Sequence, residues 1–468
     1  MSIVVSIDLG TTKITSLAFD IGRNELLARG TQVSDADDTS KADRVRGRSE
    51  WDARKIGRHG FDCLKLVCDQ LGARTQEIVG IGITGQQHGV VLTDRHNDPL
   101  SPLINWQDRR SLEVIPGLGV SCLDAARDLI GVDSWRRTGC QLQPGFMAVT
   151  LFWLKMNGLL PESAHACFIM DYFGSLLTGQ SPITEPSCAG SSGVLDVRLR
   201  QWSDEAIDAL ALPRSLFPEV REANERIGIL THAAAEDTGL PVGTPVFAPI
   251  GDHQASFIGS VSDRRESVLV NVGTGAQVAV YTEQHEFLLP IELRPYPCGG
   301  NLLSNVGLAG GWAYQITDQF FRDIGRSVFN LNVATPIYEI MNQLAGDIVC
   351  GADGLRCDPF FSGTRRDPTA RGEMTGLSPQ NFTAGHFARA VLEGMARSLH
   401  DGYLAIQQIA GGTRSKLVAA GNGLRENQLL AEIVSQSFGM PLNFTRDREE
   451  AAYGAALVAA IGLGAKKQ

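Results

Sequence analysis

The fold is decided by the stretch Ile3–Asp20, IVVSIDLGTTKITSLAFD, in which two apolar segments flank the short turn Gly10-Thr11-Thr12. Their β-branched residues predict two buried strands joined as a hairpin. A tight turn exposes backbone N–H groups and the threonine hydroxyls add donors, so the turn can hold a phosphate without a Walker-type lysine. Asp8 ends the first strand, where its carboxylate can hold a hydrated Mg²⁺. In isolation, such a turn is more often an ordinary hairpin.

A second hairpin of the same design lies in the other half of the chain. Residues 267–281, SVLVNVGTGAQVAVY, again place two β-branched strands around a turn, here Gly273-Thr274-Gly275. Its plain reading is another β-turn, but two phosphate-type turns in opposite halves form a weak internal repeat. A chain of 468 residues is also too long for one ordinary core. We therefore expect two α/β domains, residues 1–245 and 246–468, which face one another.

A third glycine-containing turn, Gly421-Asn422-Gly423, follows a predicted strand over 416–420. Glycines let the backbone approach a flat ligand, and the start of a helix favours anions. A plain strand–helix turn is the commoner case, but after two phosphate hairpins an adenine pocket is favoured. Apolar spacing predicts helices over residues 148–157, 171–177, 387–410, 428–438 and 450–463.

Asp252 is the candidate general base. The segment Gly251-Asp252-His253 follows the apolar run 246–250, which places a carboxylate where a strand ends and a helix begins. The structural alternative is an N-cap aspartate. An unperturbed Asp has a pKa of about 3.9 and is a weak base. That suffices where proton transfer lags behind a loose transition state and catalysis comes from positioning and Mg²⁺ electrostatics.

Side chains suited to a sugar gather in the first half of the chain. Polyols need paired donors and acceptors together with an apolar face. The candidates are Gln86, Gln87, His88, Trp106, Gln107, Asp108, Asp171 and Tyr172. Each has a structural alternative as well: His88 as a turn residue, Trp106 as core filling and Asp171 as an N-cap.

Bulk composition excludes several classes of protein. A net charge of −10 argues against a nucleic acid or an anionic membrane surface as partner. The nine cysteines show no CxxC pair, so zinc binding is disfavoured and reduced thiols in the cytosol are expected. The N-terminus has no basic n-region typical of a signal peptide. We expect a cytoplasmic protein whose partners are small molecules, with a homodimer left open.

These motifs together resemble the FGGY carbohydrate kinase family over nearly the whole chain. The most specific match pairs residues 372–377, GEMTGL, with residues 386–393, HFARAVLE, eight residues later. Residues 8–12, 251–255 and 450–456 and the Gly-Thr-Gly hairpin also fit the family in order. The resemblance implies two ribonuclease H-like (actin-like ATPase) domains with an interdomain cleft. It also implies an ATP-dependent kinase that uses Mg²⁺.

The resemblance and the residue patterns together assign the site. Asp252 is the catalytic base, and Asp8 and Asp252 hold the metal. The nucleotide residues are Gly10, Thr11, Thr12, Lys13, Gly273, Thr274, Gly311, Gln315, Gly421, Asn422 and Asn427. The sugar residues are Gln87, His88, Trp106, Asp108, Asp171, Asp252 and His253.

Within the family, the segment 85–89, GQQHG, resembles the ketose branch more than glycerol kinase. Thr150 stands where the family's first signature has Lys, and Met170 where xylulokinases have Lys; sedoheptulokinase-like sequences share both changes. Position 15 is Thr rather than basic, but Lys13 lies two residues earlier on a strand and can point to the same face. Asn422 replaces a usual glycine.

The resulting hypothesis is phosphorylation of a ketose at its terminal primary hydroxyl, with sedoheptulose as first choice. Xylulose or another pentulose is the alternative substrate. Two other classes are weighed: an actin-fold ATPase that uses no sugar, and a catalytically silent sugar-binding regulator. Intact Asp8 and Asp252 count against the regulator.

Overall fold

The computed structural model describes residues 2–131, 133–361, 363–364, 369–445 and 448–466. It divides into two compact units. Unit 1 comprises Met1–Gly259, Leu293–Leu302 and Glu449–Gln468, and unit 2 comprises Ser260–Glu292 and Leu303–Arg448. Two α/β units agree with the expected fold class, whereas a domain division at residue 245 stays a prediction.

Unit 1 is built on a mixed sheet in the order β13-β14-β5-β1-β2-β3, with β15 also paired to β5. The opening hairpin, β1 (Ile3–Leu9) and β2 (Lys13–Asp20), is antiparallel as predicted, while β5 (Ile78–Gly85) runs parallel to β1. The remaining strands are β3 (Glu25–Val33), β13 (Arg226–Ile229), β14 (Pro245–Phe247) and β15 (Ile250–Gly251). Both β14 and β15 run parallel to β5.

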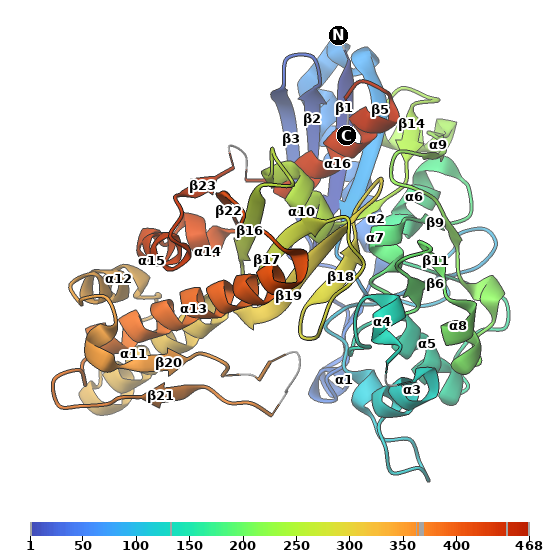
Figure 1. Cartoon of the computed structure of the whole chain (residues 1–468). Helices are drawn as coiled ribbons and strands as arrows, with labels where there is room; N and C mark the ends of the chain where they lie inside the picture. The colour runs from blue at the N-terminus through green and yellow to red at the C-terminus, as the bar shows by residue number, and fades with distance from the viewer. Residues whose placement is uncertain (1, 132, 362, 365–368, 446–447, 467–468) are drawn as a thin grey trace. The chain divides into compact units, whose positions relative to one another are not determined.

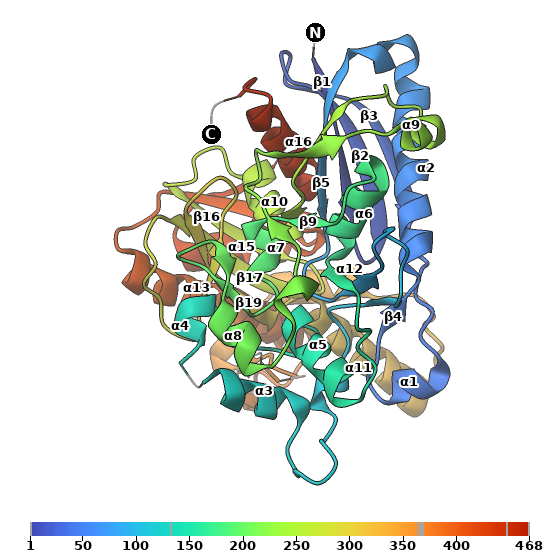
Figure 2. The ribbon, with the colours of Figure 1, turned by 90° about the vertical axis from the view of Figure 1, so that its right-hand side faces the viewer.

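Two helices cover the opposite faces of this sheet: α2 (Ala53–Leu71) and α16 (Glu450–Gly462), as Figure 2 shows. Alternation along β1 explains the arrangement, because successive strand residues point to opposite faces. Val5 and Ile7 belong to the apolar core that contains the buried face of α2. Val4 instead packs with the alanines of α16.

The small residues of α16 allow a very close approach to its neighbours. A Cβ on Gly82 of β5 would lie 2.2 Å from the carbonyl oxygen of Ala455. A Cβ on Gly454 of α16 would lie 1.9 Å from the carbonyl oxygen of Ala255. The predicted small-residue helix over 450–463 is therefore confirmed, and it packs through backbone as well as side-chain atoms.

The rest of unit 1 consists of short helices and two-stranded ribbons beside the sheet (Figure 1). The predicted helices over 148–157 and 171–177 correspond to α5 and α6. The helices are α1 (Lys41–Val45), α3 (Cys122–Ile130), α4 (Trp135–Thr138), α5 (Met147–Met156), α6 (Ile169–Thr178), α7 (Pro186–Ala189), α8 (Asp204–Ala209), α9 (His232–Thr238) and α10 (Asp252–Ser260). The ribbons pair β4 (Glu50–Trp51) with β7 (Leu103–Ile104), β6 (Val91–Thr93) with β8 (His165–Cys167), β9 (Ile183–Thr184) with β12 (Glu219–Val220), and β10 (Leu195–Asp196) with β11 (Gln201–Trp202).

The sheet of unit 2 repeats the local topology of the first. Its strand order is β18-β19-β17-β16-β22-β23. The hairpin of β16 (Ser267–Val272) and β17 (Gly275–Thr282) is antiparallel, and β22 (Lys416–Ala420) runs parallel to β16. In the first unit β5, β1 and β2 have this same arrangement, so the internal repeat inferred from the two hairpins is confirmed.

The other elements of unit 2 follow the predicted order. The predicted helices over 387–410 and 428–438 correspond to α13 and α15. The strands are β19 (Asn301–Ala309), β20 (Arg356–Asp358), β21 (Glu373–Thr375) and β23 (Leu442–Phe444), together with β18 (Glu292–Pro295). Most of β18 and the first two residues of β19 fall in the segment Leu293–Leu302 that is counted with unit 1. The helices are α11 (Gly311–Phe329), α12 (Tyr338–Gly346), α13 (Ala384–Ala410), α14 (Asn422–Arg425) and α15 (Gln428–Phe438). Within the described residues, none of the helices combines the length and the apolar character needed to cross a membrane.

The close packing of α16 predicts the effect of a single added methyl group. Gly454→Ala should lower the free energy of unfolding by about 1–3 kcal/mol, because the Cβ meets backbone that cannot move aside. Gly346→Ala is the control, because in the described part of the chain its added Cβ meets nothing within 4 Å. The higher helix propensity of alanine should raise the free energy of unfolding of this variant by up to ~1 kcal/mol. Thermal and denaturant unfolding of both variants tests this difference in sign, and two equal effects would contradict it.

Candidate active site

The carboxyl ends of three parallel strands meet at one edge of the unit 1 sheet. In the parallel registers, Asp8 of β1 lies beside Thr84 of β5, and Gly251 of β15 lies beside Gly85. The Gln86 N–H donates to the Leu9 carbonyl at 3.1 Å. Asp8, the segment after Gly85 and Asp252 are thereby brought together, as expected for polar residues that follow parallel strands.

The first phosphate turn is joined directly to the sugar candidates. The indole Nε1 of Trp106 donates to Thr11 Oγ1 at 3.0 Å, and the Thr11 hydroxyl donates to Gln86 Oε1 at 3.3 Å. The Trp106 side chain is still 39% exposed, so part of its ring can receive a ligand. Gly10 is partly exposed and Thr12 fully exposed at the same turn.

Lys13 is held by a residue that sequence reasoning missed. Its Nζ lies 2.7 Å from both carboxylate oxygens of Glu449, which directly precedes α16. Arg29 lies 3.6 Å from the same carboxylate. Thr15 is buried, so of the two positions only Lys13 is placed to meet an anion. The acidic pair Glu449-Glu450 before a small-residue helix was the available signal, but nothing local linked it to Lys13.

The Asp8 carboxyl is electrostatically strained. Burial, together with the carboxylates of Asp252 and Glu449, raises its pKa to about 7 against the opposing charge of Lys13. Among the described residues, its Oδ1 atom has no hydrogen-bond partner. The charge that would satisfy this carboxyl is a cation.

Asp252 is the first residue of α10. Its Oδ1 accepts the N–H of the next residue, His253, at 2.8 Å, whereas an N-cap side chain accepts the second or third N–H of the helix, so the N-cap alternative stays a prediction. Burial raises its pKa to about 6, and backbone N–H groups of His253 and Gln87 partly oppose the shift. The sequence-based assumption of an unperturbed pKa is therefore corrected upward. The carboxyl titrates closer to neutrality and is a stronger base once ionised.

Gln87 and His88 are fixed by the turn that begins with α7. Gln87 Nε2 donates to the Ser187 carbonyl at 2.9 Å, and a Cβ on Gly251 would lie 2.2 Å from that nitrogen. His88 Nδ1 lies 2.7 Å from the Ser191 carbonyl, which requires the proton on Nδ1 in the neutral ring. The His88 ring stacks on Phe146 with centroids 4.2 Å apart. Both side chains are therefore held rigidly.

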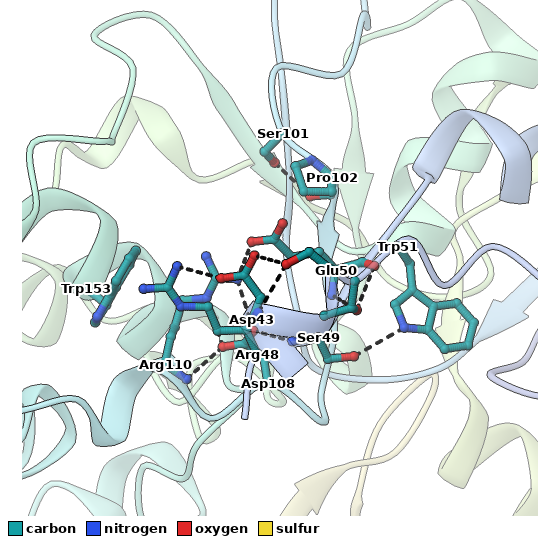
Figure 3. A network of polar contacts seen from close by, with 12 residues as sticks. Asp43, Arg48, Ser49, Glu50, Trp51, Ser101, Pro102, Asp108, Arg110 and Trp153 are labelled. Atoms are coloured by element: carbon teal, nitrogen blue, oxygen red, sulfur yellow. Dashed lines mark hydrogen bonds and ion pairs between the residues drawn. The ribbon is translucent and has the colours of Figure 1, made fainter. Parts of the chain in front are cut away.

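Asp108 supports the Trp106 loop from within. It is 1% exposed; Oδ2 accepts the Ser49 N–H at 2.8 Å and Oδ1 accepts Arg110 Nε at 2.8 Å. Figure 3 shows this contact within a larger polar network, in which Arg110 also reaches Glu50 at 2.6 Å. The Asp108 carboxylate is thus occupied by protein partners, and its predicted contact with the sugar finds no support in its placement.

The Arg110 guanidinium is further held against an aromatic ring. Its Cζ lies 5.1 Å from the centre of the Trp153 ring, and the Cζ of Arg48 lies 5.0 Å from that centre. Figure 3 labels all three side chains. Trp153 Nε1 donates to Glu113 Oε2 at 3.2 Å. The network anchors the loop on which Trp106 stands.

Asp171 is placed in the core of unit 1. It is fully buried as the third residue of α6, and its Oδ2 accepts the Phe168 N–H at 3.1 Å. Burial raises its pKa well above the usual value. Sequence reasoning predicted a capping alternative for Asp171, and this is the role its contacts describe; its predicted sugar contact stays a prediction without structural support.

The nucleotide candidates of unit 2 gather around the end of β16. The Gly311 N–H, at the start of α11, donates to the Gly273 carbonyl at 2.9 Å, and the Trp312 N–H donates to the Thr274 carbonyl at 3.1 Å. Gln315 is exposed one turn further along α11. The second phosphate turn and the start of α11 thus form one surface.

The Gly421-Asn422 turn lies beside the same strand. Gly421 has φ of 85°, and a Cβ there would lie 2.4 Å from the Val272 carbonyl oxygen, so glycine is required. Asn422 opens α14. Asn427 caps α15 through the Leu430 N–H at 3.0 Å and is therefore engaged in the fold itself.

Comparison with known proteins identifies the family. Residues 3–259 match the N-terminal domain, and residues 268–463 the C-terminal domain, of the FGGY family of carbohydrate kinases. Similar relatives include L-fuculokinase of Escherichia coli K12 (28% identity; 99% of this chain, 93% of the relative) and sedoheptulokinase of Mus musculus (25% identity; 97% of each chain). A solved xylulose kinase of Rhodospirillum rubrum has a TM-score of 0.85 at 24% identity, covering 100% of this chain and 91% of its own. The chain belongs to the FGGY carbohydrate kinases, which are ATP-dependent phosphotransferases.

Proposed function

We propose that this kinase transfers the γ-phosphoryl group of ATP to the terminal primary hydroxyl of a ketose, with sedoheptulose as the first choice. The observation that carries the proposal is the position of Asp252: a carboxyl with a pKa raised to about 6, at the edge where Asp8, Gln87 and the Thr11 turn also lie.

Asp252 acts as general base. The ketose hydroxyl oxygen forms a bond to the γ-phosphorus, the bond from that phosphorus to the bridging oxygen of ADP breaks, and the hydroxyl proton passes to the Asp252 carboxylate. In a loose transition state the hydroxyl becomes acidic only late, so a moderate base suffices. The raised pKa brings Asp252 closer to the hydroxyl in basicity while leaving it ionised at neutral pH.

Mg²⁺ fits the residues at this edge. The partnerless Asp8 oxygen, and the negative charge of Asp252 and Glu449 that Lys13 offsets only in part, favour a cation at this edge. Within the described residues, no group of three or more His, Cys, Asp or Glu side chains forms a complete metal cage. Mg²⁺ usually takes one or two carboxylates together with phosphates and water, so Asp8 and Asp252 would hold it. When bound, it neutralises phosphate charge.

Nucleotide binding is proposed for the glycine turns of unit 2. The Thr274 hydroxyl and backbone N–H would serve the phosphates, while the N–H groups of Gly273 and Gly311 hold the turn by donating to the Gly275 and Gly273 carbonyls. Gly421 and Asn422 would lie beside the adenine ring. On unit 1, we propose that Lys13 and the Gly10-Thr11-Thr12 turn also contact phosphate. In the resting structure Lys13 is paired with Glu449, so an incoming phosphate competes with that carboxylate.

The choice of sugar rests on a few rigid groups. Gln87 and His88 offer fixed polar contacts, and Trp106 offers an apolar face, the combination that polyols need. Relatives named sedoheptulokinase, xylulose kinase, L-fuculokinase and glycerol kinase are all 25–28% identical, so the names do not separate the substrates. Xylulose remains the second candidate. A pocket distinguishes sugars of different carbon-chain length because the wrong sugar leaves polar groups of the pocket without hydrogen-bond partners.

Asp252→Asn tests the catalytic assignment. Loss of the proton acceptor should lower kcat by roughly 10²–10⁴-fold while the affinity for ATP stays near that of the wild type. The matched control is Asp237→Asn, which changes an exposed aspartate of α9 and should leave kcat unchanged. ADP release is measured with sedoheptulose, xylulose, ribulose, L-fuculose and glycerol. Full activity of Asp252→Asn would refute the assignment of Asp252 as general base. If glycerol proves to be the best substrate, the assignment of a ketose as substrate is wrong.

Asp8→Asn tests the charge at the metal edge. Because the native pKa of Asp8 is raised from 3.8 to about 7, ionisation destabilises the native state increasingly as the pH rises through this interval. The variant cannot ionise, so its Tm minus that of the wild type should grow from pH 5 to pH 8 in metal-free buffer. Asp237→Asn should show a constant difference. An Asp8→Asn difference that is equal at both pH values would contradict the electrostatic assignment.

A further inference from the structure

We propose that Ser187, oriented by Glu185, is a positioning residue. It fixes the candidate base Asp252 and the proposed sugar contact Gln87 in position relative to one another. The inference rests on the proposed function, because it assumes that these two side chains act on the sugar. Neither Ser187 nor Glu185 was singled out by the sequence motifs.

Ser187 contacts both segments through different atoms. Its Oγ accepts the N–H of Gly251, the residue directly before Asp252, at 2.9 Å. Its carbonyl oxygen accepts Gln87 Nε2 at 2.9 Å. Ser187 is itself fully buried, so both bonds are shielded from competing water. One residue therefore fixes the end of β15 and the side chain that lies against it.

Glu185 determines which way the serine hydroxyl points. A serine hydroxyl rotates freely and can donate one bond and accept two. Here it donates to Glu185 Oε2, which also accepts the Ser187 N–H at 2.7 Å. The donated proton is thereby committed to Glu185, and a lone pair is left for the Gly251 N–H.

The carboxyl of Glu185 is costly to bury. It is fully inaccessible, and burial raises its pKa to about 7 although Arg200 and Ser187 oppose the shift. Arg200 lies 3.8 Å from Oε1, but its shorter contacts, 2.6 and 2.8 Å, are to Glu222. A buried ion pair of this kind is weak evidence for stability, so its benefit must lie in the geometry that it imposes.

The same segment also holds the third sugar candidate. Ser191, which follows α7, accepts His88 Nδ1 through its carbonyl at 2.7 Å and the His88 N–H through its Oγ at 3.2 Å. Cys188 Sγ donates to the Pro249 carbonyl at 3.3 Å. Residues 185–191 thus form a template behind the sugar edge. A displacement of about 1 Å in such a support can cost roughly 10²-fold in rate.

Ser187→Ala is the direct test, with Ser192→Ala as matched control. Both serines are fully buried in one turn, but the Ser192 hydroxyl bonds to the Ala189 carbonyl at 2.6 Å and the Val194 N–H at 3.1 Å instead. With sedoheptulose, or the sugar of the panel that raises ADP release most, Ser187→Ala should lower kcat and raise the sugar KM. We expect a combined loss of roughly 10–10²-fold in kcat/KM, with the KM for ATP unchanged. Ser192→Ala should lose less than about threefold at a similar Tm.

Combining the variant with Asp252→Asn separates this inference from the proposed function. Once the base is gone, Ser187→Ala should no longer lower kcat but should still raise the sugar KM, because the turn whose Ser187 carbonyl holds Gln87 has lost its hydroxyl bonds to Glu185 and to the Gly251 N–H. Full activity of Asp252→Asn alone would refute the base and leave the Ser187 comparison intact. Sugar kinetics of Ser187→Ala equal to those of Ser192→Ala would overturn the positioning role.

Glu185→Gln tests the positioning role independently if Ser187→Ala does not fold. The amide keeps the size and one acceptor oxygen but loses the charge that commits the Ser187 proton. We expect a fall of at least about tenfold in sugar kcat/KM at an unchanged KM for ATP. Wild-type sugar kinetics in this variant would overturn the proposal.

Discussion

The parallel pairing of β1 and β15 with β5 is the constraint on which the site depends. It sets Asp8 and Asp252 at one edge of a sheet whose two faces are closed by α2 and α16, and this burial raises the pKa of both carboxyls. The carboxylates of Asp252 and Glu449 add their charge to the effect of burial on Asp8. Under the proposed function, this edge is where the cation and the phosphates would bind.

The edge that carries Asp8 and Asp252 depends on the close packing of α16 against β5 and α10. Its glycine and alanines bring backbone to within contact of Gly82 and Ala255, so the helix lies flat against β5 and α10. Glu449 directly precedes this helix and reaches Lys13 across 436 residues of sequence. The same small residues that close the core therefore also deliver the carboxylate that holds Lys13 and raises the pKa of Asp8.

Local sequence patterns were sufficient to predict the helices and strands, whereas the roles of individual side chains depend on tertiary contacts. The two hairpins, the helices and Asp252 at a strand–helix junction follow from β-branched runs, turn residues and apolar spacing. Asp108 and Asp171 looked equally like ligand contacts, because a polar residue on a loop or at a helix start gives the same local signal whether it faces solvent or the core. In the structure Asp108 accepts Arg110 Nε and Asp171 accepts the Phe168 N–H, partners two and three residues away, and the predicted sugar contacts stay predictions. Glu449 and Ser187 were missed because their partners Lys13, Gln87 and Gly251 lie far away in the sequence. Glu185 was missed with them, since it contacts Ser187.

The candidate site contains two kinds of polar residue, which differ in whether their hydrogen bonds are satisfied within the protein. Asp8 Oδ1 is left without a hydrogen-bond partner among the described residues, whereas Asp252, Ser187, Asp108 and Arg110 are bonded within the protein. Burying Asp8 and Glu185, whose pKa values are both raised to about 7, lowers stability near neutral pH. The apolar core around α2 and the backbone packing of α16 must offset that loss. Under the proposed function, the same unsatisfied charge would give the phosphates and their cation a preorganised place to bind, in return for a less stable resting state.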